Sequence, residues 1–180
     1  GKFKGKRLET INFYVRPTAS LKREAIFSII ESYSLKKNIE FFKNKIFLDL
    51  FSGIGTMGLE GISRGINKVI FYENNHKVLK VLKNNCKLLC KKEEYIIFEE
   101  DVLESNINLD FNNISIIYID PPYNKYNLNN LLNILETKIN SETIIIVETS
   151  INDNFDISNK LNLIKRKKYG KTNLNFLVLS

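Results

Sequence analysis

The chain of 180 residues is poor in the side chains that most often serve as general bases, metal ligands or cross-links. It has one histidine, His76, so hydrolytic dyads and triads would lack their usual base. Its two cysteines, Cys86 and Cys90, are four residues apart in a helical pattern and match no metal or redox spacing. The sequence therefore predicts no metal site, and both thiols are expected to be reduced in a cytoplasmic protein.

Long apolar runs are also absent. The longest, such as residues 143–147, have the length of a strand and fall far short of a membrane-spanning helix. The first seven residues are basic and lack the apolar core of a signal peptide. We therefore expect no membrane association, and we expect a monomer because no exposed apolar stripe stands out.

What the chain does have is an ordinary globular composition with an excess of positive charge. Hydrophobic residues make up 43% and charged residues 26%, and the length suits one domain with a substantial core. The net charge of +7 favours a polyanionic partner. Because lysine, asparagine and isoleucine are abundant throughout, as AT-rich coding alone would produce, the position of a charge is more informative than the total.

Apolar patterns predict an alternation of helices and strands. Helical spacing occurs over about 19–35, 56–64, 76–90 and 127–138, and strand-like runs occupy 46–50, 68–73, 94–98, 115–119 and 143–147. Two further strand-like runs after Leu161 predict a closing antiparallel pair. This order predicts an α/β fold with a mostly parallel sheet and helices on both faces. Residues 1–18 are predicted to be a small basic hairpin or arm ahead of one domain at 19–180.

The segment Asp120-Pro121-Pro122-Tyr123 directly follows a predicted strand. In open α/β sheets, ligands bind at the carboxyl edge of the strands, where this tetrapeptide must lie. Two prolines fix the backbone and remove two N–H donors, so an acceptor-only carboxylate, set carbonyls and a flat ring meet at one point. Together they suit the exocyclic amine of a nucleobase, which donates two hydrogen bonds while its ring stacks on an aromatic face. A strand-ending turn with a buried tyrosine would have the same sequence.

A glycine-rich turn follows the first predicted strand of the sheet. Gly53, Gly55 and Gly58 satisfy the G-x-G-x-x-G fingerprint of dinucleotide-binding folds. Glu73 ends the next strand about 20 residues on, where a carboxylate that binds ribose hydroxyls is expected. A nicotinamide-dependent oxidoreductase is therefore one hypothesis for this chain.

Asp49 argues against a cofactor that carries phosphate. Its carboxylate ends the strand before the glycine turn and would repel a pyrophosphate, and no lysine or arginine lies between Phe47 and Ser63. A phosphate-free cofactor with a cationic amino group, such as S-adenosylmethionine, would instead be attracted. Glu73 would then accept from its ribose hydroxyls, and Asp101, after the third strand, from its adenine amine. Three carboxylates at successive strand ends favour this second hypothesis.

With its glycine turn and its Asp-Pro-Pro-Tyr segment, the chain resembles the class I S-adenosylmethionine-dependent methyltransferases that act on exocyclic amines. The matching residues are Asp49-x-Phe51-x-Gly53-x-Gly55 and Asp120-Pro121-Pro122-Tyr123. Further elements resemble the bacterial RsmD-type enzymes, which methylate a guanine N2 in 16S ribosomal RNA. These elements are the basic start at 1–8, Arg16-Pro17-Thr18 followed by Arg23-Glu24-Ala25-Ile26-Phe27, and residues 58–65. The similarity spans nearly the whole chain and keeps the order of the motifs.

The resemblance implies a Rossmann-like, doubly wound sheet of seven strands with the last one antiparallel. It also implies S-adenosylmethionine as the cofactor and 16S rRNA, in the small ribosomal subunit or its assembly intermediate, as the partner. The implied target is guanine 966 in standard rRNA numbering. By the same resemblance, the catalytic residues are Asp120, Pro121, Pro122 and Tyr123. The implied cofactor-binding residues are Asp49, Phe51, Gly53, Gly55, Glu73, Asn74, Asp101, Val102 and Thr18.

A group of cations near the N-terminus is predicted to contact RNA phosphates. Its members are Lys2, Lys4, Lys6, Arg7, Arg16, Lys22 and Arg23. A solvated basic arm would show the same charges. Arg16 is the strongest candidate because Pro17 and a helix start fix its position, and Thr18 is a candidate N-cap for that helix.

Two other hypotheses stand beside the nicotinamide enzyme. An adenine-N6 or cytosine-N4 methyltransferase would have the same Asp-Pro-Pro-Tyr segment, although enzymes of this kind that act on DNA usually have an added recognition domain. A non-catalytic ribosome assembly factor could keep the fold. It would have no need, however, for the full set of Asp49, Glu73, Asp120 and Tyr123.

Overall fold

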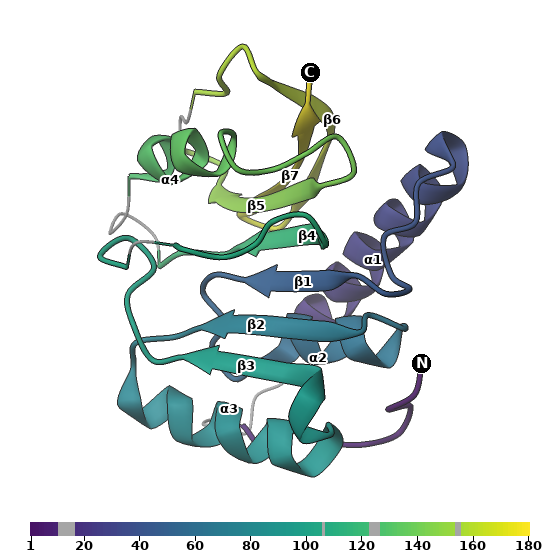
Figure 1. Ribbon diagram of the computed structural model, residues 1–180, viewed down its shortest axis with the longest axis vertical. Coiled ribbons are helices and arrows are strands. Elements are labelled where there is room, and N and C mark those ends of the chain that lie inside the picture. The colour runs from purple at the N-terminus through teal and green to yellow at the C-terminus, as the bar shows by residue number, and fades with distance from the viewer. Residues whose placement is uncertain (11–16, 106, 123–126, 154–155) are drawn as a thin grey trace.

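Helices and strands alternate along the chain as the apolar pattern predicts (Figure 1). The computed structural model describes residues 1–10, 17–105, 107–122, 127–153 and 156–180. The helices are α1 (Pro17–Lys37), α2 (Thr56–Ser63), α3 (His76–Leu89) and α4 (Leu128–Leu135), with a short 3-10 turn, η1 (Lys92–Glu94). The strands are β1 (Ile46–Asp49), β2 (Lys68–Tyr72), β3 (Tyr95–Phe98), β4 (Ile114–Ile119), β5 (Ile144–Ser150), β6 (Leu161–Tyr169) and β7 (Thr172–Leu179). None of the helices in the described part of the chain is both long and apolar enough to cross a membrane.

The seven strands form one sheet in the order β3-β2-β1-β4-β5-β7-β6. The pairs β1–β2, β1–β4, β2–β3 and β4–β5 are parallel, whereas β7 runs antiparallel to both β5 and β6. The predicted Rossmann-like, doubly wound sheet with an antiparallel last strand is therefore confirmed. Strand order reverses between β1 and β4, and a ligand crevice is expected at the carboxyl edge of such a switch point.

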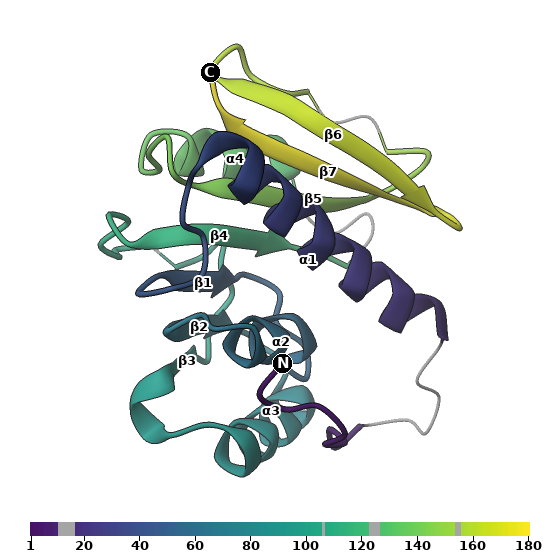
Figure 2. The same ribbon diagram turned by 90° about the vertical axis from the view of Figure 1, so that its right-hand side faces the viewer.

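The sheet is the middle layer of the molecule, and its side chains alternate between two faces. On one face, Phe47, Phe71 and Ile116 pack with apolar residues of α1, α2 and α3. On the other face, Ile70 and Ile117 pack with α4 and with the segment between β3 and β4. Figure 2 shows α1 lying across the face that also carries α2 and α3. Every residue of β4 is buried, as expected of a strand that is covered on both faces.

The N-terminal residues lie against the domain. Lys2 N donates to Ser63 O at 2.7 Å, and Phe3 N donates to Ser63 Oγ at 2.9 Å. Residues 1–10 consist of turns and irregular backbone without a strand. The next part of the predicted arm, residues 11–16, lies outside the described residues, so the hairpin remains a prediction.

The first helix begins slightly earlier than the sequence predicts. α1 starts at Pro17, a residue whose fixed φ suits the first helical position. Thr18 therefore stands inside the first turn, and its predicted place as the N-cap is wrong. The side chain of Thr18 and the whole of Arg16 lie outside the described residues, so their predicted contacts stay predictions.

Candidate functional site

The turn after β1 explains the spacing of the three glycines. Gly53 and Gly55 have φ values of 55° and 86°, a region in which a side chain is strained. Gly58 serves a different purpose, because α2 packs directly against β2 at this point. A Cβ on Gly58 would lie 2.4 Å from Phe71 Cε1 and 2.6 Å from Val69 Cγ1. The chain can thus fold back tightly, and the N-terminus of α2 comes to the carboxyl edge of the sheet.

Glu73 ties the glycine turn to the end of β2. Its Oε2 accepts from Gly53 N at 2.9 Å, and its Oε1 accepts from Asn75 N at 2.8 Å. Asn75 in turn caps α3, since its side chain accepts from Lys77 N. Each carboxylate oxygen of Glu73 has a second lone pair. The predicted contact with ribose hydroxyls is therefore compatible with these bonds.

Asp49 lies beneath the glycine turn, only 1% exposed, and is not among the residues that line the cleft described below. Its Oδ2 accepts from Gly58 N at 3.2 Å, whereas Oδ1 has no hydrogen-bond partner among the described residues. Burial raises the pKa of Asp49 to about 8. The Gly58 N–H opposes this rise, and the charges of Asp120 and Glu73 add to it. A cationic group near Asp49 would stabilise its ionised form.

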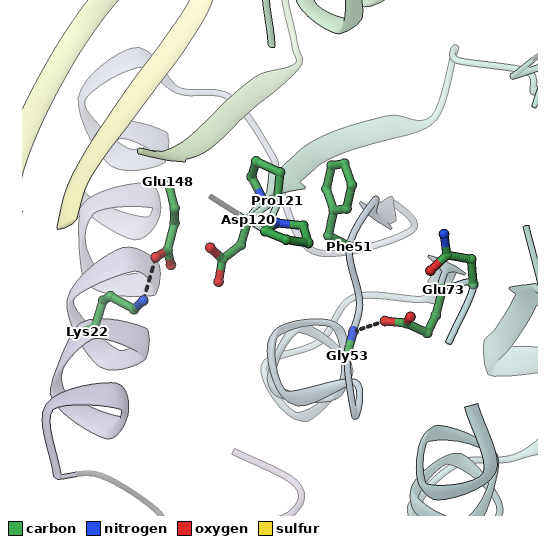
Figure 3. Close-up of a pocket in the computed structure, with 9 residues that line it drawn as sticks. Lys22, Phe51, Gly53, Glu73, Asp120, Pro121 and Glu148 are labelled. Atoms are coloured by element: carbon green, nitrogen blue, oxygen red, sulfur yellow. Dashed lines mark hydrogen bonds and ion pairs between the residues drawn. The ribbon is translucent and has the colours of Figure 1, made fainter. Parts of the chain in front are cut away.

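A cleft of about 450 Å³ opens at the carboxyl edge (Figure 3). This volume is in the usual range for a small-molecule site. The cleft brings together the glycine turn, the residues after β2 and the residues after β4. Its described lining residues are Lys22, Phe51, Gly53, Glu73, Asn74, Asp120, Pro121, Pro122 and Glu148. The fourth predicted catalytic residue, Tyr123, lies outside the described residues.

A narrow slot adjoins the cleft on the side of β3. It shares Phe51, Glu73 and Asn74 with the cleft, and Asp101 and Val102 belong to its opposite wall. Asn74 Nδ2 donates to Asp101 Oδ2 at 2.9 Å, which joins the two walls. With about 20 Å³, the slot has room for about one water. An adenine ring would therefore require the walls to separate.

Asp120 is a half-buried acid of the cleft, and its carboxylate has no hydrogen bond to any described residue. Burial raises the pKa of Asp120 to about 7, the negative charge of Glu148 adds to the rise, and Lys22 opposes it. Pro121 and Pro122 follow without backbone N–H groups, so this part of the cleft presents acceptors. A ligand group with two N–H donors therefore suits it.

Glu148 was not predicted from the sequence, yet it lines the cleft beside Asp120. Its buried carboxylate accepts a hydrogen bond from Tyr118 OH and pairs with Lys22 Nζ at 2.5 Å. The signal in the sequence is an acid directly after the apolar run 143–147, which parallels the place of Asp120 after its own strand. Successive parallel strands put such acids at the same edge.

The six predicted RNA-binding cations that the structure describes fall into two groups. Three already pair with a carboxylate: Lys2 with Glu94 at 2.7 Å, Lys22 with Glu148 at 2.5 Å, and Arg23 with Glu60 at 3.6 Å. Lys4, Lys6 and Arg7 are exposed and have no acidic partner among the described residues. The structure therefore favours these three for an external anion, and it places Lys22 in the cleft.

Comparisons with known proteins show which family the chain belongs to. Residues 1–178 match the family model described as "Conserved hypothetical protein 95". The "Ribosomal RNA small subunit methyltransferase D" of Buchnera aphidicola subsp. Acyrthosiphon pisum is 29% identical over 93% of this chain and 84% of that protein. The "Uncharacterized methylase RP545" of Rickettsia prowazekii is 27% identical over 97% of this chain and 93% of that protein.

Among solved structures, the "Putative methyltransferase yhhF from Escherichia coli" has the same fold. It superposes with a TM-score of 0.81 at 21% identity, and the match covers 100% of this chain and 95% of that one. The family match extends over nearly the full length, so it includes both the glycine turn and the residues after β4. The chain therefore belongs to the "Conserved hypothetical protein 95" family, that of the RsmD-type S-adenosylmethionine-dependent methyltransferases.

Proposed function

We propose that this protein transfers a methyl group from S-adenosylmethionine to the exocyclic N2 amine of a guanine in 16S rRNA of the small ribosomal subunit. The observation that supports this most is the carboxylate of Asp120, which faces the cleft beside the glycine turn with no hydrogen bond to any described residue. Family membership supports the methyl chemistry, and the name of the Buchnera relative refers to small-subunit rRNA. The proposed target is the guanine at position 966 in standard rRNA numbering.

The residues around the glycine turn suit S-adenosylmethionine chemically. When bound, it supplies a methyl group that its sulfonium has made electrophilic. The Oδ1 atom of Asp49, which has no partner among the described residues, would stabilise a cationic amino group. Glu73 has lone pairs left for ribose hydroxyls, and the carboxylate of Asp101 would accept from an adenine amine once the slot widens.

Asp120 serves the incoming amine in two ways. Its carboxylate and the backbone carbonyl at Pro121 accept the two amine hydrogens, which turns the nitrogen lone pair toward the methyl group. As the N–C bond forms and the C–S bond breaks, these hydrogens become more acidic. The acceptors therefore stabilise the transition state more than the ground state. The nitrogen then loses one proton, for which Asp120, with a pKa of about 7, is a suitable acceptor.

Exposed cations orient the RNA around the cleft in this proposal. The target base leaves its stack and enters beside Pro122, with Tyr123 as its predicted stacking partner. We assign Lys4, Lys6 and Arg7 to the flanking phosphates because they are exposed and have no acidic partner among the described residues. The partner is the small ribosomal subunit or its assembly intermediate, and the protein acts as a cytoplasmic monomer.

Transfer of labelled methyl groups tests the proposal directly. Methyl-labelled S-adenosylmethionine is incubated with unmodified small subunits, naked 16S rRNA and duplex DNA. Asp120→Ala removes the proposed acceptor, and Asp110→Ala is the matched control because it removes an exposed acid from the loop before β4. We expect label on a guanine N2 of the subunit RNA, retained in Asp110→Ala and lost in Asp120→Ala.

The other outcomes separate the competing hypotheses. Label on adenine N6 or cytosine N4, or on DNA alone, would show that the proposed substrate is wrong and that methyl transfer is right. If no label is transferred although S-adenosylmethionine binds at equilibrium, a non-catalytic assembly factor is favoured. Thermal stabilisation by NAD, with none by S-adenosylmethionine, would indicate the oxidoreductase.

A further inference from the structure

Two neighbouring carboxylates lie at the cleft. Ile119 of β4 pairs with Val147 of β5, so the residues that follow, Asp120 and Glu148, stand side by side at the carboxyl edge. Figure 3 shows the Asp120 carboxylate directed toward Glu148 and Lys22, which come from β5 and α1. This arrangement joins three elements that are far apart in the sequence.

The two carboxylates differ in their bonding. Glu148 is fully buried, its Oε1 accepts from Tyr118 OH, and its Oε2 accepts from Lys22 Nζ at 2.5 Å. Asp120 is half-buried, and its carboxylate has no hydrogen bond to any described residue. Glu148 is therefore committed to partners within the protein, and Asp120 is the member of the pair that a ligand can engage.

Charged and titratable groups from four elements surround Asp120. Glu148 on β5 and Asp49 on β1 are acids, Lys22 on α1 is a cation, and Tyr118 on β4 carries the hydroxyl bound to Glu148. The charge of Glu148 favours a proton on Asp120, whereas the charge of Lys22 disfavours it. Such charge effects are stronger at a partly buried site than in bulk water. Because Lys22 and Glu148 bind each other, each fixes the position from which the other acts.

We infer that Glu148 and Lys22 form a positioning pair that tunes Asp120 as the proton acceptor of methyl transfer. The charge of Glu148 makes Asp120 a stronger base, while Lys22 holds Glu148 in place and keeps Asp120 ionised near neutral pH. Both residues act through Asp120, and of the three only Asp120 contacts the substrate amine. This inference rests on the proposed function, because it assigns roles in the same reaction.

The two members of the pair are expected to move the pH dependence in opposite directions. Asp120 must be ionised to accept N–H bonds, so kcat rises with pH through its pKa of about 7. Glu148→Gln removes the negative neighbour and moves the rising limb of the kcat–pH profile to lower pH by roughly one unit. Lys22→Met removes the cation and moves the limb to higher pH by roughly the same amount. KM for the RNA stays close to that of the wild type in both variants.

A matched pair at the opposite edge of the sheet provides the control. Lys45 Nζ pairs with Glu142 Oε2 at 2.6 Å, and neither residue lines the cleft. Lys45→Met and Glu142→Gln make the same chemical changes and leave the limb at the wild-type pH. Glu148→Asp keeps the charge, so its limb stays near the wild-type pH even where kcat falls.

A second readout tests the pair without any methyl transfer. The side-chain carbon signal of Asp120, followed by NMR in protein labelled at aspartate, gives its pKa in the absence of RNA and cofactor. We expect the pKa of Asp120 to fall in Glu148→Gln and to rise in Lys22→Met. Circular dichroism establishes that each variant is folded. If Glu148→Gln does not fold, Lys22→Met still tests the direction in which the pKa of Asp120 changes. The Lys22 side chain is 22% exposed and tolerates replacement more readily.

The outcomes distinguish a failure of the pair from a failure of the proposed function. Active variants whose limbs do not move, or whose limbs move in the same direction, would overturn the tuning role. A different outcome is a wild type that methylates no RNA while the pKa of Asp120 still shifts in opposite directions in the two variants. The proposed function would then be wrong, and the effect of Glu148 and Lys22 on the pKa of Asp120 would be confirmed.

Discussion

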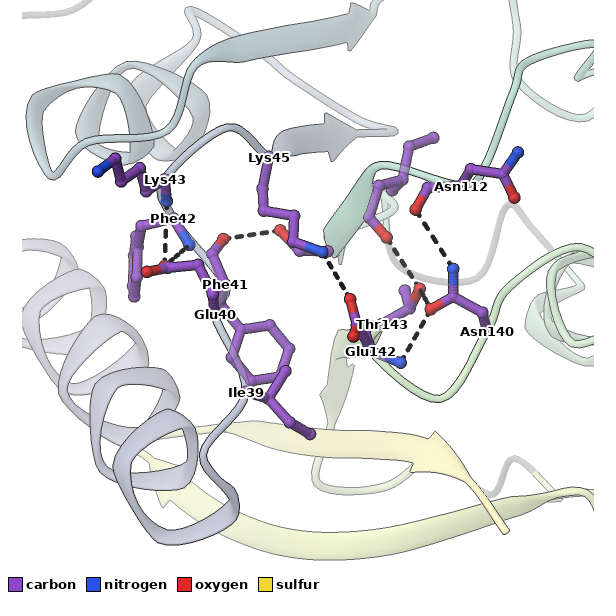
Figure 4. A network of polar contacts seen from close by, with 12 residues as sticks. Ile39, Glu40, Phe41, Phe42, Lys43, Lys45, Asn112, Asn140, Glu142 and Thr143 are labelled. Carbon is purple, nitrogen blue, oxygen red and sulfur yellow. Dashed lines mark hydrogen bonds and ion pairs between the residues drawn. The ribbon is translucent and has the colours of Figure 1, made fainter.

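Polar groups have opposite surroundings at the two edges of the sheet, where the parallel strands begin and where they end. At the amino edge, polar side chains bind one another and the nearby backbone (Figure 4). Lys45 Nζ pairs with Glu142 Oε2 at 2.6 Å, and Glu142 N donates to Asn140 Oδ1 at 2.8 Å. Thr143 Oγ1 donates to Ile114 O at 2.8 Å, which links the starts of β4 and β5. These contacts join the starts of the strands to the loops before them.

The carboxyl edge instead holds acids in places where their charge is unfavourable. Burial raises the pKa of Asp49 to about 8 and that of Asp120 to about 7. At the amino edge the opposite holds, because the Phe42 N–H, bound to Glu40, lowers the pKa of that carboxyl. Buried acids with raised pKa values reduce stability and are concentrated at functional sites. The amino edge therefore stabilises the sheet, whereas the carboxyl edge holds acids that are available for chemistry and lower the stability of the fold.

The largest effect is expected from Asp120→Asn, which removes the acceptor and keeps its size. Presenting N–H donors to a substrate amine should lower kcat by about 10²–10³-fold, comparable to the loss of one oxyanion-hole donor. The affinity for S-adenosylmethionine, measured by calorimetry, should change only a few-fold. Asp110→Asn on the exposed loop is the matched control and should retain wild-type kcat. Turnover in Asp120→Asn within a factor of three of the wild type would remove Asp120 from the mechanism.

A smaller effect is expected from Gly58→Ala, which tests how the carboxyl edge is built. The new Cβ would meet Phe71 at 2.4 Å, so α2 must move away from β2. Overpacking of this kind should lower the free energy of unfolding by about 1–3 kcal/mol, measured with urea. Gly61→Ala lies in the same helix, and its Cβ would come no closer than 3.1 Å to Phe47, so its loss should be smaller. Equal stability of the two variants would contradict the packing role of Gly58.

The pH dependence of stability should differ in sign between the edges. The pKa of Asp49 rises from 3.8 to about 8 on folding, so the folded protein binds more protons in that interval and loses stability as pH increases through it. Asp49→Asn removes this loss and should raise the unfolding free energy at pH 8 by about 1 kcal/mol or more. Its affinity for S-adenosylmethionine should fall, because the negative charge is lost.

Glu40→Gln gives the opposite test at the amino edge. The lowered pKa of Glu40 means that its ionised form contributes stability above the unfolded value of 4.5, and this contribution disappears as the pH falls. The variant should thus be slightly less stable than the wild type at neutral pH and equal to it in acid. Urea unfolding at several pH values measures both variants. Parallel pH profiles for Asp49→Asn and Glu40→Gln would contradict the contrast between the edges.

The sequence predicts the fold and part of the cleft because those features are local. Apolar β-branched runs identify the strands, and Asp120, which directly follows such a run and precedes two prolines, is thereby placed at the carboxyl edge. The glycine spacing identifies the turn after β1, since Gly55 needs a positive φ and Gly58 needs close packing. Each of these signals is contained in about ten consecutive residues.

The features that the sequence does not predict depend on contacts between distant elements. Lys22 looks like the other N-terminal lysines, and only the packing of α1 against β5 turns it onto Glu148. Glu148 joins Asp120 through the register of β4 and β5, which the sequence does not specify. Asp49 ends its strand as predicted, but the fold of the glycine turn covers it. Local patterns therefore predict the edge of the sheet at which a residue lies, and tertiary packing determines which residues its side chain contacts.

The smallest effect is expected from breaking the ion pair at the amino edge. The Glu142 side chain is 57% exposed, so water screens its attraction to Lys45 despite the 2.6 Å separation. A double-mutant cycle with Lys45→Met and Glu142→Gln should give a coupling energy of about 0.5 kcal/mol or less in urea unfolding. The same cycle with Lys22→Met and Glu148→Gln should give a larger value, because Glu148 is fully buried and loses its compensating cation. Equal coupling energies would mean that burial at the carboxyl edge does not distinguish the two pairs, and the contrast between the edges would then rest on Asp49 and Asp120 alone.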